Sequence, residues 1–403
     1  KQAAEIILSM AQGETEGAQL IITPQKNINS FNVVIRDLRN TEGDIFGAQS
    51  VKVLKQHYLY QPQKSDFNNN ENVPAGYIPD MLLPLEIASD YNETSIRAGE
   101  NQGITFEFTS TSQTVPGIYT GEYDLVIDGK TTKIPVTVTI HDVDITASQT
   151  KSSFIINRIH LMRGETDGSI EMYEKYFKLL LDNKVTATYA PGFDISPKVM
   201  ADYIIKYWDN PAFTSYSIPT RVGLESYSVN IAIYSQFLRE LVQRSTPEHN
   251  LVSRAECYVL SLDEPQAINS IDGSARVQRE ISALKAANTK VFNQVVENGF
   301  FDKYDAAFKA LIKQSIDNIQ FLITSPYNSR FDNVDVTYVP QFQHYETYDE
   351  KEALYSHAQK FDNELWWYGC ISPKYPWPTY HIDDYLQGAR AVGWMQKYNK
   401  ITG

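Results

Sequence analysis

The chain has 403 residues, a length that fits two domains or one very large one. Its content of 42% hydrophobic and 21% charged residues is that of a globular protein and excludes a disordered or collagen-like chain. The formal net charge is −13, and no run of Lys or Arg could neutralise a row of phosphates, so nucleic-acid binding is not expected. The longest apolar stretches are far shorter than the roughly 20 residues of a membrane helix, so no membrane span is predicted.

The N-terminal part of the chain has the pattern of short strands separated by turns. Runs such as FNVVIRDL and GITFEFTS are rich in β-branched and aromatic residues, and several alternate apolar with polar positions. Asp128-Gly129 between two such runs indicates a hairpin, because Gly accepts the positive φ that the turn requires. The Asn- and Pro-rich segment 63–84 is expected to be a long loop. We predict an all-β sandwich domain over residues 1–148.

The remaining residues, 149–403, alternate between strand-like and helical patterns. The expected strands are 152–160, 187–190, 216–222, 257–262, 290–296, 334–341 and 364–370. The expected helices are 171–184, 200–208, 233–244, 275–287, 304–314, 349–359 and 384–398. The apolar run 319–325 is either an extra strand or part of a helix. This alternation predicts an α/β fold with a parallel sheet, a (β/α)8 TIM-like barrel whose eighth strand is missing from the sequence.

The clearest candidate for chemistry follows the expected strand at 257–262. Reactive groups in such barrels lie at the carboxyl ends of strands, and here the run CYVLSL ends in Asp263, Glu264 and Pro265. Two adjacent carboxylates suit glycoside hydrolysis, which needs a proton donor for the leaving oxygen and a second group for the charge at C1. The alternative is a plain helix start, where acidic residues and proline are common.

Aromatic residues are dense in the segment WWYGCISPKYPWPTYHID. Trp and Tyr rings stack on the C–H faces of sugars while their polar tips bind hydroxyls. For Trp367, Tyr368 and Trp377, contact with a ligand and a place in the core are equally open. Trp366 is expected to point away from the barrel axis, into the core.

Further candidates lie near other strand ends. They are Arg158, Tyr189, Tyr338 and Asp383. Arg158 could bind sugar hydroxyls or a carboxylate, or form a structural ion pair. Asp383 could bind substrate or cap the last helix.

No cofactor and no metal site are predicted. The seven histidines are scattered without the spacing of a metal motif, and the glycine-rich phosphate loops and the G-x-S-x-G nucleophile motif are absent. Cys257 and Cys370 are the two cysteines, and both lie in strand-like runs. They are expected to be free thiols in the core.

Three stretches of the chain, taken in order, resemble a known family. LSMAQGETEGAQLIITP, YVLSLDEP and WWYGC–PWPTYHIDDYLQGARAVGWMQ are similar to glycoside hydrolase family 123 and to a related bacterial domain of unknown function with the same barrel. The resemblance implies a retaining exo-β-N-acetylhexosaminidase, and more specifically a β-N-acetylgalactosaminidase that releases terminal GalNAc. It implies substrate-assisted catalysis, in which the 2-acetamido oxygen attacks C1. Asp263 would orient the amide, and Glu264 would protonate the leaving group and then activate water.

The resemblance also implies an aromatic box around the acetamido group, for which Trp367, Tyr368, Tyr338 and Tyr189 are the candidates. The partner would be a glycan with a terminal N-acetylhexosamine. The alternative function is a non-catalytic carbohydrate-binding protein on a hydrolase-like barrel, which would have no need of the acidic pair. We expect a location outside the cytoplasm, in the periplasm, on the cell surface or secreted, with a leader that is not present in this sequence.

Overall fold

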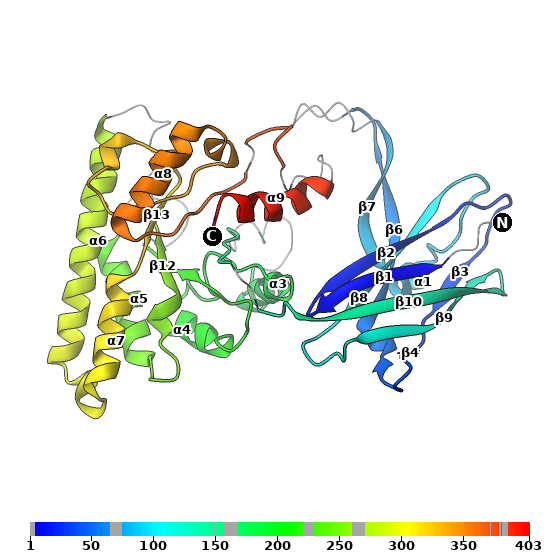
Figure 1. The fold of residues 1–403 in the computed structure, drawn as a ribbon, viewed down its shortest axis with the longest axis horizontal. Helices are drawn as coiled ribbons and strands as arrows, with labels where there is room; N and C mark the ends of the chain where they lie inside the picture. The colour runs from blue at the N-terminus through cyan, green and yellow to red at the C-terminus, as the bar shows by residue number, and fades with distance from the viewer. Residues whose placement is uncertain are drawn as a thin grey trace. The chain divides into compact units, whose positions relative to one another are not determined.

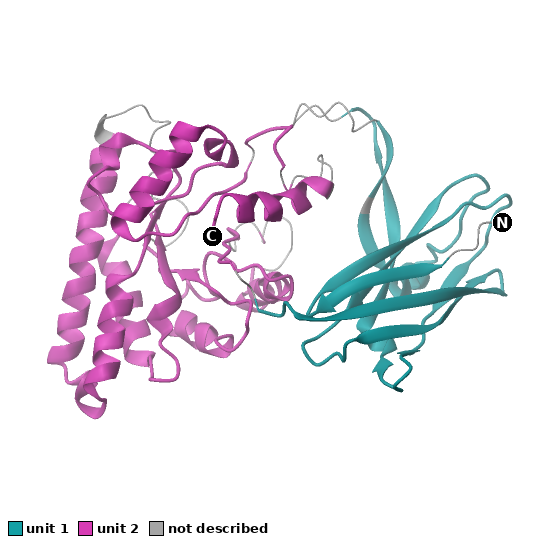
Figure 2. Ribbon diagram, in the orientation of Figure 1, with its two compact units in different colours: residues 1–66, 71–147 teal, residues 67–70, 148–403 magenta. Residues whose placement is uncertain are grey.

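The structure is a computed structural model that describes residues 5–64, 75–147, 150–156, 161, 168–220, 229–259, 271–370, 372–378, 380 and 386–403. The chain forms two compact units (Figure 2). The first comprises residues 1–66 and 71–147, and the second comprises 67–70 and 148–403. Strands make up most of the first unit, whereas helices and short parallel strands make up the second (Figure 1).

The first unit contains two β-sheets. The strands of one are β1 (Ile6–Gln12), β3 (Phe31–Val34), β4 (Leu38–Arg39), β5 (Ile45–Phe46), β9 (Gly117–Ile127) and β10 (Lys130–Asp144). Those of the other are β2 (Thr15–Ile22), β6 (Val51–Gln61), β7 (Gly76–Pro84) and β8 (Gln102–Thr109), followed in the order β2–β8–β6–β7. The first sheet has the order β1–β10–β9–β4–β5, and β3 also pairs with β9. A short helix, α1 (Leu85–Asp90), follows β7.

The two sheets bury one common hydrophobic cluster, as the layers of a β-sandwich do. On β8, Ile104, Phe106 and Phe108 alternate toward this cluster and are fully buried, and Val136 and Val138 of β10 join them. The alternation of apolar and polar residues along β8 and β10 is therefore the sequence signal that predicts strands in this region. The predicted β-sheet character of the N-terminal region is confirmed.

Two local predictions in this unit have opposite outcomes. The hairpin at Asp128-Gly129 is confirmed, since β9 and β10 pair across it and both residues have positive φ, 46° and 77°. The expected loop over 63–84 is wrong in part, because β7 pairs with β6. Pro79 and Pro84 argue against a strand when the sequence is considered alone. Both prolines are tolerated because β7 lies at the edge of its sheet, where a missing N–H costs little.

The second unit alternates helices with parallel strands. Its helices are α3 (Ile170–Asp182), α4 (Pro197–Lys206), α5 (Ile231–Arg244), α6 (Ile271–Glu297), α7 (Ala306–Asp317), α8 (Tyr348–Phe361) and α9 (Leu386–Tyr398). Its strands are β11 (Tyr216–Ser217), β12 (Ala255–Tyr258), β13 (Phe321–Ile323) and β14 (Thr337–Tyr338), paired in parallel in that order. The coarse prediction of an α/β region with a parallel sheet is confirmed.

The helices form where apolar residues recur at helical spacing behind a capping side chain. In α3, Tyr173, Phe177 and Leu181 lie one turn apart and are buried. Ser169 caps the start of this helix by accepting a hydrogen bond from the Met172 amide. The helix predicted over 171–184 is confirmed.

One expected strand is part of a helix. Residues 290–296 lie inside α6, and the strand of this repeat is β13, from the run 319–325. Val291 and Val295 lie one helical turn apart and are buried, so their β-branched side chains serve a helix face. The sequence KAANT that precedes this run contains no Gly or Pro to end the helix.

Backbone hydrogen bonds extend the parallel sheet beyond β11. The amide of Ser217 donates to Thr188 O at 2.7 Å. The Phe154 amide donates to Thr186 O at 2.8 Å, and its carbonyl accepts from the Thr188 amide at 3.0 Å. Segments 151–156 and 186–189 therefore continue the sheet on this side.

The sheet continues on the other side until it returns to its start. The Tyr368 amide donates to Pro340 O at 3.0 Å, just after β14. The Trp367 amide donates to Gly403 O at 3.3 Å, and the Lys151 amide donates to Thr402 O at 2.7 Å. The hydrogen-bonded segments among the described residues therefore close a ring. Residues 401–403, where no strand was expected, have no assigned strand but lie between the segments at 151 and 365–367.

Candidate functional site

A cavity of about 380 Å³ is bordered by residues from several segments of this ring. The described residues that line it are Ser153, Phe154, Ile155, Tyr258, Leu322, Thr324, Val339, Trp366, Trp367, Tyr368, Gly369, Cys370 and Gly403. Thr324 and Val339 follow β13 and β14 directly. The cavity therefore reaches the carboxyl ends of the parallel strands, the edge at which α/β proteins place their reactive groups.

Side chains on the strands divide into an inner and an outer set. Leu322, Val339 and Trp366 form a cluster of their own, with Tyr258 and Tyr368 packed against it. The alternate residues of β13, Phe321 and Ile323, belong instead to the large cluster that contains the helices. We call the first set the inner cluster, and all of its members line the cavity.

The two adjacent tryptophans belong to different clusters, and the place of Trp366 differs from the prediction. Trp366, expected in the outer core, belongs to the inner cluster. Trp367 borders the cavity, but its ring packs against Phe342 at 4.7 Å and Tyr345 at 6.0 Å between centroids, within the outer core. Successive strand residues alternate between faces, so an error of one residue in register exchanges the two roles.

Tyr338 does not line the cavity, although it was a candidate for the acetamido box. Its ring lies 4.8 Å from that of His357 on α8, and its hydroxyl donates to Asn328 O at 2.9 Å. Burial raises the pKa of this hydroxyl. The neighbouring Val339 faces the cavity instead. The structure thus places Tyr338 in the outer core.

The other aromatic candidates divide between the cavity and the core. Tyr368 is half-buried, lines the cavity and packs on the inner cluster. Tyr189 is buried and stacks on Phe193, with 4.7 Å between centroids. Trp377 is half-buried against the outer core. Tyr189 and Trp377 are not among the described residues that line the cavity.

Four candidates lie outside the described residues, namely Asp263, Glu264, Arg158 and Asp383. Two strands of the cavity wall precede three of them in the sequence. β12 ends at Tyr258, shortly before Asp263 and Glu264, and Ile155 shortly precedes Arg158. Tyr258 and Ile155 both line the cavity.

Two residues of the cavity, Thr324 and Cys370, do not follow from the sequence analysis. Thr324 is a polar residue that ends an apolar strand, the same signal that singled out Asp263, but its run could not be assigned. Cys257 is buried as expected, whereas Cys370 is exposed at the cavity, and the prediction of a core thiol is wrong there. Gln341 Nε2 donates to Cys370 Sγ at 3.5 Å.

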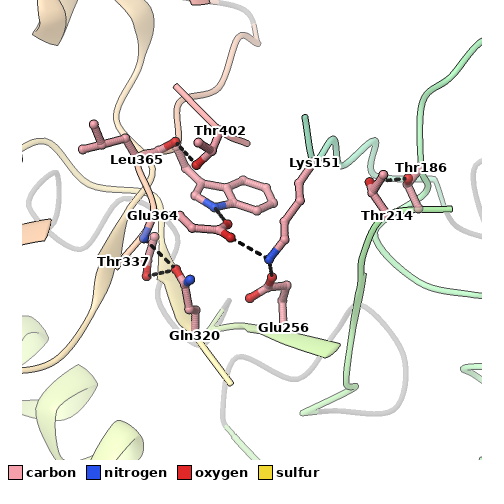
Figure 3. A network of polar contacts seen from close by, with 10 residues as sticks. Lys151, Thr186, Thr214, Glu256, Gln320, Thr337, Glu364, Leu365 and Thr402 are labelled. Atoms are coloured by element: carbon pink, nitrogen blue, oxygen red, sulfur yellow. Dashed lines mark hydrogen bonds and ion pairs between the residues drawn. The ribbon is translucent and has the colours of Figure 1, made fainter. Parts of the chain in front are cut away.

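A buried polar network lies at the amino ends of the same strands (Figure 3). The Lys151 ammonium forms ion pairs with Glu256, at the start of β12, and with Glu364 at 2.9 Å. Trp366 Nε1 donates to Glu364 Oε2 at 3.0 Å. Burial raises the pKa of Glu256 to about 7, although the Lys151 ammonium opposes this shift and Glu364 adds to it. No sequence motif indicated this network.

Among the residues that the structure describes, no group of three or more His, Cys, Asp or Glu side chains could hold a metal ion. Within the same residues, every helix is too short or too polar to cross a bilayer.

Comparison with known proteins rests on structure, because no family model and no curated protein matches the sequence. A family 123 glycoside hydrolase from Clostridium perfringens, studied for glycolipid glycan hydrolysis, matches with a TM-score of 0.59 at 13% identity. The match covers 98% of this chain and 72% of that one. The chain has the fold of a family 123 glycoside hydrolase. The resemblance seen in the three sequence stretches is thus confirmed for the family 123 fold.

Other matches involve about a third of the chain. MyfA, the major subunit of Myf fimbriae from Yersinia enterocolitica, has a TM-score of 0.18 at 13% identity, over 35% of this chain and 94% of that one. CfaE, the adhesive subunit of an Escherichia coli fimbria, has a TM-score of 0.17 at 10% identity, over 39% and 55% of the two chains. Such low scores carry no argument about this protein, and the family 123 fold remains the informative likeness.

Proposed function

We propose that the protein is a glycoside hydrolase whose second unit is a (β/α)8 barrel with its active site at the cavity. The observation that carries the proposal is that β12 ends at Tyr258 in the cavity wall, shortly before Asp263-Glu264 in the sequence. The family 123 fold supports it, as does the closed path of hydrogen-bonded segments. The cavity has the aromatic lining and scattered polar groups that suit a sugar.

The finer proposal is a retaining exo-β-N-acetylhexosaminidase, with terminal β-GalNAc on a glycan as its substrate. In the first step the 2-acetamido oxygen attacks C1 while the C1–O bond to the leaving group breaks. Glu264 gives its proton to the departing oxygen, and Asp263 orients the amide and stabilises its positive charge. Water then attacks C1, giving its proton to Glu264, and the acetamido group re-forms. No enzyme nucleophile has to reach C1, so two neighbouring carboxylates suffice.

For sugar binding, the inner aromatic rings are the best placed of the described residues. Tyr368 lines the cavity and is half-buried, so its ring is available for stacking, and Trp366 forms a buried part of the same wall. Arg158 and Asp383 remain proposed contacts to hydroxyls, on the strength of their sequence positions. Trp367 borders the same cavity, and we propose that it supports the wall from its outer side.

The test is hydrolysis of aryl β-N-acetylgalactosaminides and aryl β-N-acetylglucosaminides. We expect Glu264→Gln and Asp263→Asn each to lower kcat/KM by about 10²- to 10⁴-fold. Glu297→Gln, which makes the same chemical change at an exposed position at the end of α6, should leave the rate unchanged. Full activity in both acid variants would refute the mechanism.

The cavity's aromatic lining would serve a carbohydrate-binding protein equally well. That alternative predicts binding of N-acetylgalactosamine, measured by calorimetry, without product from any aryl glycoside. It would also predict that Glu264→Gln binds the sugar as the natural chain does and has no other phenotype.

A further inference from the structure

Lys151 places one ammonium between two carboxylates. Its Nζ pairs with Glu256 Oε1 and lies 2.9 Å from Glu364 Oε1. In Figure 3 the side chain extends from its own segment toward both acids. The Glu256 side chain is only 4% exposed, and its Oε2 atom has no hydrogen-bond partner among the described residues. We call Lys151, Glu256 and Glu364 the Lys151 triad.

Each member of the triad begins a segment that lines the cavity a few residues later. Lys151 precedes Ser153, Glu256 precedes Tyr258, and Glu364 precedes Trp366. The later residue of each pair lines the cavity. The amino ends of parallel strands share one edge of a sheet, so the triad joins segments that are far apart in sequence beneath the cavity.

The charges of the triad do not balance when all three groups are ionised. Two carboxylates and one ammonium leave a net negative charge in a poorly hydrated site, which is costly. Among the residues that the structure describes, the groups that face Glu256 are Lys151, the Glu364 carboxylate and the backbone N–H of Gln320. None of these brings a second positive charge. A proton retained on Glu256 removes the imbalance.

The triad is connected to the cavity through Trp366. The indole Nε1–H donates to Glu364 Oε2 at 3.0 Å, so Glu364 accepts from both Lys151 and the indole. The face of the same ring packs against Gly403 so closely that a side chain at position 403 would overlap it. Trp366 is thus held at its edge by the triad and at its face by backbone.

We propose that Lys151 is a positioning residue: it ties three segments together beneath the cavity, holds Glu256 and Glu364 on one ammonium, and thereby sets the orientation of Trp366 in the cavity wall. Loss of a proton from Glu256 places a new negative charge beside Glu364, the acceptor of the indole N–H. The cavity wall therefore responds to pH through Trp366. This inference does not depend on the proposed hydrolase activity.

The experiment follows the fluorescence of Trp366 in the full chain as pH is varied from 5 to 9. Subtracting the spectrum of Trp366→Phe isolates this residue from the other tryptophans. We expect its emission maximum to shift with a midpoint near pH 7, where Glu256 titrates. In a Glu256→Gln background, compared with Glu256→Gln/Trp366→Phe, the shift should be lost.

Three results would overturn the proposal: no shift in the natural chain, the same midpoint in Glu256→Gln, or a Trp366 spectrum unchanged by neutralising the triad. The last is tested with Lys151→Met, Glu256→Gln and Glu364→Gln combined, which removes every charge without leaving one unpaired. We expect that variant to fold and to show an altered, pH-independent Trp366 spectrum. If Glu256→Gln does not fold, Glu364→Gln should move the midpoint to lower pH, because the Glu364 carboxylate contributes to the raised pKa of Glu256.

Discussion

Each of the two units contains an ionic cluster, and the ratio of cations to carboxylates in one cluster is the reverse of that in the other. In the first unit, Asp124 on β9 pairs with Arg36 and, at 2.6 Å, with Lys133 on β10, so that one carboxylate faces two cations. In the second unit, the Lys151 triad sets one cation between two carboxylates. The side chains of Arg36 and Lys133 are about half exposed, 47% and 53%, whereas the Glu256 side chain is 4% exposed.

The pKa values of the two carboxylates are shifted in opposite directions. Hydrogen bonds from Arg36 and Lys133 lower the pKa of Asp124 to about 2. Burial raises the pKa of Glu256 to about 7. The Asp124 contribution to stability is therefore present above its usual pKa and lost as pH falls toward 2. The Glu256 contribution is present in acid, below its usual pKa, and is lost as pH rises through about 7.

The largest expected effect is that of Lys151→Met, which would leave the buried Glu256 and the half-buried Glu364 without a cation. We expect the free energy of unfolding of the second unit to fall by about 3–5 kcal/mol at pH 7. All five tryptophans lie in this unit, so denaturant unfolding followed by tryptophan fluorescence measures it. A loss no larger than that of an exposed lysine would contradict the buried role of the triad.

Glu256→Gln should have the next largest effect, and its sign should depend on pH. The shift from the usual value of 4.5 to about 7 corresponds to ~3 kcal/mol of stability lost by the natural chain as pH rises through that interval. The variant lacks this loss, so its stability relative to the natural chain should increase from pH 5 to pH 8. Parallel curves of unfolding free energy against pH would refute the assignment.

Asp124→Asn should have a smaller effect, confined to acid. The natural chain loses the Asp124 contribution as pH falls toward 2, and the variant has none to lose. We therefore expect the variant to be less stable near pH 6 and its acid unfolding to be less steep. Circular dichroism of the β-sheet signal measures this unit, which has no tryptophan. Identical acid transitions would show that the cation pair does not stabilise the sheet.

Lys178→Met should have the smallest effect and serves as the control for Lys151→Met. Lys178 pairs with Asp182 one turn away on α3, and both side chains are more than half exposed. Such pairs contribute about 0.3–0.5 kcal/mol. A loss above ~1 kcal/mol in the same unfolding experiment would mean that exposure does not separate the two kinds of pair.

The parts of the fold that could be predicted are those with local signals. The spacing of Tyr173, Phe177 and Leu181 specified α3, and the turn at Asp128-Gly129 specified a hairpin. The strand predicted over 290–296 is wrong because Val and Phe fit a strand and a buried helix face equally well.

The parts of the site that could not be predicted depend on long-range geometry. The strand that leads to Asp263 was found because an apolar run ends abruptly in acids. Which of Trp366 and Trp367 faces the cavity depends on register within the ring, and short strands leave that undetermined. Lys151 and Glu256 meet across 105 positions, a separation for which a single sequence carries no signal.

The ring of hydrogen-bonded segments closes where Lys151 meets Thr402, and we call this junction the seam. It has a consequence for the order of folding. Its hydrogen bond, 2.7 Å long, joins residues from nearly opposite ends of the second unit. Contacts of such large separation bear a high loop-closure entropy and form late, after local helices. We expect the seam to open first under mild denaturant, so that the amide proton of Lys151 exchanges with solvent before those at the centre of the sheet.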